Sequence, residues 1–331
     1  MKKQGPFYRV LQAALAFIAA WLALGPAHGQ PWRPNKPIEI IVSSGAGGNT
    51  DKLARTIQRI LQDEKIVTTP LIVMNKTGGN QTLARVYLNQ HPGDSHYVEL
   101  SNPTLIANQV MGLTQQHYTD FTPIAVLLDE YTVFSVRVDA PFKSGAELMR
   151  HLANQPDSLS IGLTTRGGAN HVSFMLAAKA AGVDMKRLKI VSFKSNGESI
   201  TALLGGHIDL VASSASPALP HLQRGAIRIV AISAPKRMGG VLADVPTWIE
   251  QKINAVNSNW RALVGPRDLQ PAQVAYWEAA VSKLGESETW RKELAANFWE
   301  MQPRTGRALQ DFLAAEHREH KEILTEIGLA K

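Results

Sequence analysis

The sequence predicts an α/β protein of two domains, each built on a mostly parallel sheet flanked by helices. The chain repeats one unit, in which a short apolar strand leads into a loop of small polar residues and then an amphipathic helix. Its 331 residues exceed the roughly 250–300 that one hydrophobic core usually serves. Two extended runs, at residues 121–138 and 259–265, lack a helix between their strands, so we expect the chain to cross between the domains there.

Three strand–helix units open the first domain. A strand at residues 37–43 precedes a helix at 50–64, in which Leu53, Ile57 and Leu61 would share one face. Strands at residues 71–74 and 97–100 are each followed by a further helix. Strands that alternate with helices usually pair in parallel.

The second half repeats the pattern after the first crossing. The expected strands are residues 159–163, 189–193, 208–212 and 227–232, and the expected helices begin at residue 271, near 287 and at 305. Because the chain would cross twice, we assign residues 30–128 and 265–331 to the first domain and residues 129–264 to the second.

Composition excludes several classes of chemistry. The chain has no cysteine, which excludes disulfides, thiolate metal sites, a cysteine nucleophile and a lipid-modified N-terminal cysteine. It carries 35 Lys and Arg against 28 Asp and Glu, a formal net charge of +7, without basic clusters. This mild excess does not indicate nucleic-acid binding.

Residues 1–29 have the pattern of an export signal. Lys2, Lys3 and Arg9 precede an apolar run at 10–24, and Ala27-His28-Gly29 supplies the small residues that precede cleavage before Gln30. The alternative is a membrane anchor, but the run is shorter than the roughly 20 residues a spanning helix needs. We therefore expect a periplasmic protein.

Loops rich in Gly, Ser, Thr and Asn follow the predicted strands of both domains. The sharpest runs from Ser43 to Asp51 between a strand and a helix. Glycines let backbone N–H groups approach a ligand, and a helix start adds unpaired donors and a positive dipole end, which favour an anion. Each loop alone could be an ordinary turn, but their shared composition predicts a polar cleft at the strand ends.

Motifs for catalysis are weak. The 45–51 loop lacks the Gly-Lys-Ser/Thr ending of a phosphate-binding loop, and neither GxGxxG nor GxSxG occurs. His317 and His320 could bind a metal on one helical face, but His320 falls on an apolar stripe, which indicates a buried structural histidine. We expect no catalytic residue, no metal and no cofactor. Trp260, on the second crossing, is the tryptophan best placed to line the cleft.

Five ordered segments resemble the Bug (TctC-like) family of substrate-binding proteins of tripartite tricarboxylate transporters. They are Lys36-Pro37-Ile38-Glu39-Ile40-Ile41-Val42 with Gly47-Gly48-Asn49-Thr50-Asp51, Asn75-Lys76-x-Gly78-Gly79, Tyr118-x-Asp120-Phe121-x-Pro123-Ile124-Ala125, Ala202-Leu203-Leu204-Gly205-Gly206-His207-Ile208-Asp209 and Asp244-Val245-Pro246-Thr247. The resemblance implies a two-domain periplasmic binding protein of the type II flytrap fold. It also implies a solute receptor that captures a small carboxylate and delivers it to an integral-membrane permease.

The resemblance implies ligand contacts from loops of both domains. The first domain would contribute Ser43, Ser44, Gly47, Gly48, Asn49, Thr50, Asp51, Gly79, Asn80, Asn102 and Thr104. The second would contribute Thr164, Thr165, Asn170, Ser213, Ser214 and also Arg166, where the family commonly has small residues. Lys194 and Arg261 adjoin these loops and are either surface charges or further contacts.

The chain departs from the family pattern at Ser43-Ser44, where members often have proline and an aromatic residue, so we expect a more polar wall. Two other functions stay open. A periplasmic enzyme acting on an anion would need an acid and a base, for which Asp51 and His171 form the one pairing to test. A sensing accessory would dock on a signalling receptor instead of a permease.

Overall fold

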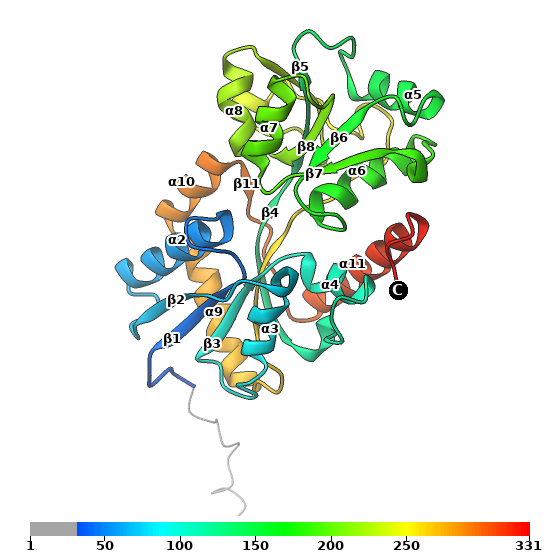
Figure 1. The fold of residues 1–331 in the computed structure, drawn as a ribbon. Helices are drawn as coiled ribbons and strands as arrows, with labels where there is room; N and C mark the ends of the chain where they lie inside the picture. The colour runs from blue at the N-terminus through cyan, green and yellow to red at the C-terminus, as the bar shows by residue number, and fades with distance from the viewer. Residues whose placement is uncertain (1–31) are drawn as a thin grey trace, which may run out of the picture. The chain divides into compact units, whose positions relative to one another are not determined.

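The computed structural model describes residues 32–331, so the predicted export signal lies outside the described residues. Residues 34–331 form one compact unit that contains two β-sheets with helices packed on them (Figure 1). Among the described helices, none is long and apolar enough to cross a membrane.

The first sheet has seven strands. They are β1 (Ile38–Val42), β2 (Leu71–Asn75), β3 (Tyr97–Ser101), β4 (Thr122–Glu130), β10 (Arg261–Gly265), β11 (Trp299–Glu300) and β12 (Arg304–Thr305). The order is β11-β4-β10-β3-β1-β2, and β12 also pairs with β4. β1 runs parallel to β2 and β3, whereas β10 runs antiparallel to β3 and β4.

The second sheet has five strands in the order β7-β6-β8-β5-β9. They are β5 (Thr132–Arg137), β6 (Ser160–Leu163), β7 (Lys189–Ser192), β8 (Leu210–Ser214) and β9 (Ile227–Ile232). β6 is parallel to β7 and β8, and β5 is antiparallel to β8 and β9. The predicted α/β architecture is confirmed, but both sheets are mixed. Strands within strand–helix units pair in parallel, whereas β5 and β10 enter from the other sheet and run the opposite way.

Ten α-helices flank the sheets in the described part of the chain. They are α2 (Asn49–Asp63), α3 (Thr82–Leu88), α4 (Thr104–Val110), α5 (Gly145–Asn154), α6 (Ala169–Ala180), α7 (Asn196–Leu204), α8 (Ala215–Gln223), α9 (Pro271–Glu286), α10 (Glu288–Asn297) and α11 (Gly306–Glu326). The sequence analysis missed α5, although Ser144 caps it by accepting a hydrogen bond from Glu147 N–H at 3.2 Å. It also missed β11 and β12, which are too short to show periodicity.

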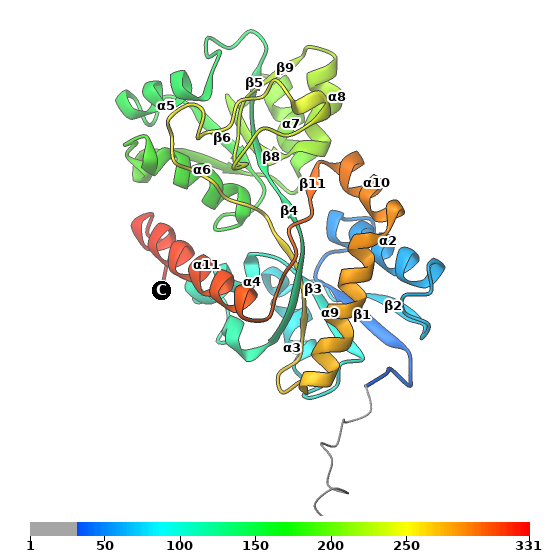
Figure 2. The ribbon, with the colours of Figure 1, turned by 180° about the vertical axis from the view of Figure 1, so that it is seen from behind.

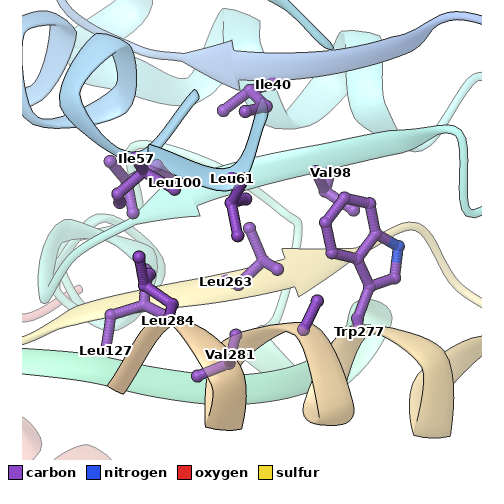
Figure 3. Close-up of a pocket in the computed structure, with 11 residues that line it drawn as sticks. Ile40, Ile57, Leu61, Val98, Leu100, Leu127, Leu263, Trp277, Val281 and Leu284 are labelled. Atoms are coloured by element: carbon purple, nitrogen blue, oxygen red, sulfur yellow. The ribbon is translucent and has the colours of Figure 1, made fainter. Parts of the chain in front are cut away.

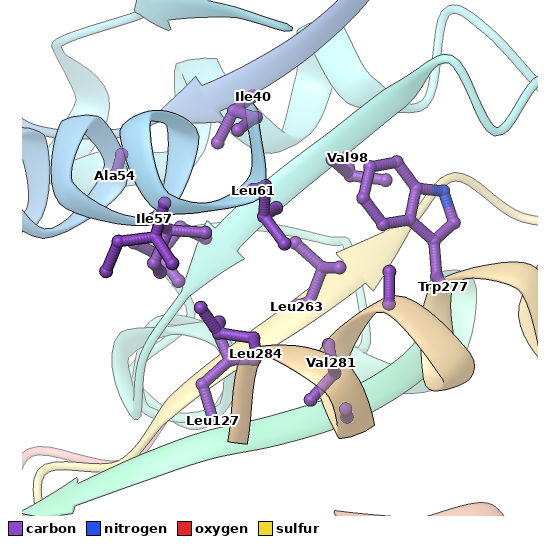
Figure 4. Close-up of a cluster of buried hydrophobic side chains, with 14 of the residues drawn as sticks. Ile40, Ala54, Ile57, Leu61, Val98, Leu127, Leu263, Trp277, Val281 and Leu284 are labelled. Carbon is purple, nitrogen blue, oxygen red and sulfur yellow. The ribbon is translucent and has the colours of Figure 1, made fainter. Parts of the chain in front are cut away.

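Apolar side chains from α2 and α9 meet those of the first sheet. Figure 4 shows Ile57 and Leu61 of α2 facing Val281 and Leu284 of α9, with Leu263 of β10 between them. A void of about 20 Å³ lies inside this cluster and has only apolar walls (Figure 3). A water molecule needs polar partners to stay in such a space, so this void is a packing gap and not a ligand site.

The chain passes between the two sheets at two adjacent places (Figure 2). Tyr131 separates β4 from β5, and it bridges to Ser258 on the returning segment just before β10. The predicted extended return is confirmed, but Arg261–Gly265 already belongs to the first sheet. The proposed division at residues 128–129 and 264–265 stays a prediction.

Candidate functional site

A cavity of about 490 Å³ lies where strands of both sheets end and helices begin. This volume falls within the range of small-molecule sites. Elements of the first sheet contribute Ser44, Gly47, Gly48, Asn49, Thr50, Gln81, Asn102, Pro103, Thr104, Asn259 and Arg261. Elements of the second contribute Thr164, Thr165, Gly168, Ala169, Asn170, Lys194, Ser195, Asn196, Gly197, Ser214 and Pro217.

The loop before α2 presents the start of that helix to the cavity. Gly47 has a φ of +78°, a left-handed conformation that favours glycine, and its N–H donates to Asp51 Oδ2 at 2.8 Å. Gly48 N–H donates to Gly45 O at 3.0 Å. These two bonds lie within the loop and its helix, and the first turn of α2 forms this part of the cavity wall. The first N–H groups of a helix have no acceptor within it and favour negative charge.

The loop before α6 repeats this geometry on the other wall. Gly167 has a φ of +76°, its N–H donates to His171 Nδ1 at 2.8 Å, and Gly168 N–H donates to Thr165 O at 3.0 Å. Burial and the charge of Arg166 lower the pKa of His171 to about 4, so its ring is neutral near pH 7. Asp51 and His171 therefore have the same structural role: each side chain accepts a hydrogen bond from a glycine N–H in its own loop.

That arrangement removes the pairing that an enzyme would need. His171 Nδ1 accepts a hydrogen bond from Gly167 N–H. Both carboxylate oxygens of Asp51 accept hydrogen bonds from residues on the first-sheet side of the cavity. Neither side chain lines the cavity. The acid–base alternative of the sequence analysis therefore has no support in the described structure.

Asp51 is buried in the first turn of α2. Burial alone would raise its pKa, but hydrogen bonds from Arg55, Gly47 N–H and Asn75 outweigh that effect and lower the pKa to about 2. The ionised carboxylate thus holds Gly47, Arg55 and Asn75 together beneath the cavity wall.

We expect Asp51 to make folding stability depend on pH between about 4 and 2. Its folded pKa of about 2 lies below the ordinary value near 3.9, so its contribution is present above pH 4 and is lost as pH falls through 2. The contribution is at most about 2.6 kcal/mol. Urea unfolding at several pH values should show a shallower acid dependence for Asp51→Asn than for the unsubstituted protein. Equal slopes for the two proteins would contradict this role. Asp94, whose pKa is also lowered to about 2, is present in both proteins and therefore does not contribute to the difference between their slopes.

Gln81 organises the first-sheet wall from an unusual backbone position. Its φ is +76°, in the left-handed region, and its Oε1 accepts from Ser43 Oγ and Asn102 Nδ2, each at 2.9 Å. Thr104 Oγ1 lies 3.0 Å from the same oxygen. Strained residues persist where their surroundings fix them, which is common at binding sites. Because these contacts all use the side-chain oxygen of Gln81, its amide nitrogen can donate a hydrogen bond to a ligand in the cavity.

A buried ion pair supports this network from below. Arg85 donates through Nη1 to Thr104 O at 3.1 Å and through Nη2 to Thr104 Oγ1 at 2.8 Å. Its Nε lies 3.5 Å from Glu99 Oε1, and both side chains are at most 2% exposed. Burial raises the pKa of Glu99, and the Arg85 charge opposes that rise.

The cavity wall has two cations and, among the described lining residues, no carboxylate. Arg261 is buried and pairs with Glu130 Oε2 at 3.0 Å, while its Nη1 donates to Asn259 Oδ1 at 2.6 Å. Lys194 is exposed and forms no ion pair with another described residue. The wall therefore favours an anion through the helix starts and Lys194, whereas Arg261 is already paired with Glu130.

Eleven predicted site residues lie on the cavity wall, and their contact with a ligand stays a prediction. They are Ser44, Gly47, Gly48, Asn49, Thr50, Asn102, Thr104, Thr164, Thr165, Asn170 and Ser214.

Six other predicted residues lie off the wall. Ser43 donates to Gln81, Ser213 donates to the carbonyl of Ser214, and Asp51 binds its own loop. Asn80 bonds Asn108, Gly79 accepts from Thr82 at the surface, and Arg166 is exposed outside the lining. In each case the side chain or carbonyl that the sequence offered to a ligand is used locally or points to solvent.

The sequence analysis also left residues out or misplaced them. Trp260, expected in the cleft, is fully buried and donates its indole N–H to Glu316 Oε2 at 2.9 Å. Its neighbours Asn259 and Arg261 reach the cavity instead, because side chains alternate along an extended segment. Ser195 and Asn196, at the start of α7, follow a strand as the predicted loops do, and that signal could have found them.

The two C-terminal histidines make contacts within the described chain. His320 is buried and its Nδ1 lies 2.9 Å from Glu316 O, while His317 Nε2 lies 3.1 Å from Gln109 Oε1. Between residues 32 and 331, no group of three His, Asp or Glu side chains is arranged to hold a metal ion.

Comparison with known proteins places this architecture in a family. The family model described as "Tripartite tricarboxylate transporter family receptor" matches residues 53–329. A curated relative from Cupriavidus necator, the "UPF0065 protein in gbd 5'region", is 28% identical over 96% of both chains. A ligand-free TctC solute binding protein from Polaromonas is 27% identical with a TM-score of 0.76, covering 88% of this chain and 99% of its own.

Other solved structures of lower identity share the fold. The periplasmic binding protein BugD is 21% identical with a TM-score of 0.73, and the alignment covers 90% of this chain and 99% of that one. From Rhodopseudomonas palustris, MatC was solved with malate (23% identical, TM-score 0.70, 88% and 99% covered) and Rpa4515 with adipate (23%, 0.76, 90% and 99%).

Proposed function

This chain belongs to the tripartite tricarboxylate transporter receptor family, a family of solute receptors and not of enzymes, and from that premise we propose that it binds a small carboxylate in the cavity between its two sheets. The bound ligand would be delivered to an integral-membrane permease of such a transporter. The predicted export signal supports a periplasmic location, as do relatives such as BugD.

One observation carries the proposal of a carboxylate ligand. The starts of α2, α6, α7 and α8 all reach the same cavity, through Asn49, Ala169, Asn196 and Ser214. Each helix start offers unpaired N–H donors and a partial positive charge. Because the described lining has no carboxylate to oppose them, an anion is the ligand class that the wall favours. Solved relatives with malate and with adipate fit the same class.

The energetics of such binding are adequate without a dedicated ion pair. A micromolar ligand requires about 8 kcal/mol of binding free energy. Four to six charge-assisted hydrogen bonds at about 1.5–3 kcal/mol each supply this before ordering costs are subtracted. Because lining residues come from both sheets, a ligand that contacts both walls would favour a closed arrangement over an open one.

A thermal-shift and calorimetric panel on the protein without residues 1–29 tests this function. The panel holds dicarboxylates, tricarboxylates, amino acids and aromatic acids, with neutral sugars as the control. We expect a carboxylate to raise the melting temperature, with about 2.7 kcal/mol of stabilisation at a hundredfold excess over Kd. Binding of neutral compounds alone, or of no carboxylate, would contradict the proposal.

Delivery to a permease has its own test. Uptake of the identified carboxylate by cells should fall when this chain is deleted and recover when it is restored. Unchanged uptake would argue instead for the sensing role that the sequence left open.

A further inference from the structure

Most side chains that line the cavity carry a polar group. Among its described lining residues, only Pro103, Ala169 and Pro217 have purely hydrocarbon side chains, and none is aromatic, valine, leucine, isoleucine or methionine. Small-molecule sites are usually lined mainly by hydrophobic and aromatic side chains, with a few polar groups for orientation. The described lining therefore has no large apolar side chain on which a hydrocarbon chain or ring could pack.

Much of the wall's hydrogen-bonding capacity is not used within the protein. Ser44 Oγ is buried, and neither it nor the hydroxyls of Thr165 and Ser214 form a hydrogen bond with another described residue. The amide nitrogen of Gln81 forms no hydrogen bond with another described residue, whereas its oxygen accepts those from Ser43 and Asn102. These groups lie on both walls, and all of them belong to the lining.

Such a wall discriminates against a ligand that cannot pair with it. If hydrocarbon is enclosed here, the hydroxyl and amide groups that reach solvent lose those hydrogen bonds and gain none, and the buried Ser44 Oγ stays unpaired. A site built to bond a ligand hydroxyl commonly rejects the analogue without it by several orders of magnitude, whereas an apolar pocket discriminates weakly.

We propose that the ligand is a hydroxylated carboxylate of the sugar-acid type, whose hydroxyl groups bond the wall while a carboxylate meets the helix starts. This inference rests on the proposed function and narrows its ligand class. It excludes aromatic acids and unsubstituted aliphatic diacids as preferred ligands. The relatives do not decide the matter, because malate carries a hydroxyl and adipate does not.

Matched pairs of acids isolate the hydroxyl contribution. Galactarate and adipate have the same chain length and both terminal carboxylates, and galactarate adds a hydroxyl on every inner carbon. Tartrate and succinate form the equivalent shorter pair. We expect the hydroxylated member of at least one pair to bind at least about a hundredfold more tightly than its partner, as measured by calorimetry.

The outcomes separate this inference from the proposed function. If adipate, succinate or an aromatic acid binds as tightly as the hydroxylated acids, or binds when they do not, the inference fails and the carboxylate receptor stands. If no carboxylate binds, both fail.

Serine substitutions test whether the wall hydroxyls act as proposed. Ser44→Ala and Ser214→Ala should each weaken binding of the hydroxylated acid about tenfold. Ser216→Ala is the matched control, because Ser216 lies two residues further along α8, is exposed and is not part of the lining. Melting temperatures without ligand check that each variant is folded. Wild-type affinity in both wall variants, or an equal loss in Ser216→Ala, would overturn the proposal.

Discussion

Replacing Gly47 by valine is expected to weaken carboxylate binding at least about a hundredfold while the protein stays folded. Gly47 has a φ of +78°, where a β-branched residue is strained by about 1–2 kcal/mol or more. The chain would relieve this strain by turning the peptide, which breaks the bond from Gly47 N–H to Asp51 and moves the start of α2. Calorimetry with the ligand found in the panel gives the affinity, and circular dichroism gives the fold.

Gly182→Val is the matched control for that variant. Gly182 has a φ of +72°, is exposed beyond the end of α6 and lies outside the cavity. A Cβ at either glycine meets no other atom within 4 Å, so both variants test backbone strain and not crowding. We expect a similar loss of stability in both and a loss of affinity in Gly47→Val alone. Equal affinities for the two variants would contradict the placement of the ligand at α2.

Arg85→Met is expected to lower the free energy of unfolding by about 3–5 kcal/mol, a larger loss than we expect from any other single substitution named above. The substitution leaves Glu99 buried without its counter-charge and removes two hydrogen bonds to Thr104. Because Thr104 is part of the cavity wall, affinity should fall as well. Urea unfolding at pH 7, followed by tryptophan fluorescence, measures the stability term.

Two further variants show whether the buried charge causes that loss. Glu99→Gln removes the charge that Arg85 balances, so the double variant Arg85→Met/Glu99→Gln should recover a substantial part of the lost stability. Arg187→Met breaks an exposed pair with Asp157 and should change stability little. If Arg85→Met unfolds as easily as Arg187→Met, or the double variant recovers nothing, the ion pair does not support the wall.

The sequence predicted the positions of the loops well, because their placement follows from periodicity. A short apolar run marked β1 and the 3.6-residue repeat marked α2, so the segment between them had to lie at a strand end. The same reasoning placed Thr164 and Thr165 between β6 and α6. Parallel pairing brings the loops of each sheet to one edge, and the cavity lies where residues from both edges meet.

Side-chain roles inside the loops were harder to predict. Asp51 and Arg166 looked like ligand contacts, but Asp51 is held by its own loop and Arg166 faces solvent. The part that Gln81 plays in organising the wall was not predicted, because it depends on a left-handed backbone that no residue pattern near it required. Hydrogen bonds such as that from Ser43 to Gln81 join residues far apart in the chain, so periodicity carries no information about them.

A crystal structure of the protein with its carboxylate ligand tests the central claim most directly. We predict that carboxylate oxygens lie within hydrogen-bonding distance of the N–H groups in the first turn of α2, while the rest of the ligand contacts loops of the second sheet. A ligand bound away from residues 48–50, or a cavity closed by its own side chains with the carboxylate elsewhere, would contradict the account.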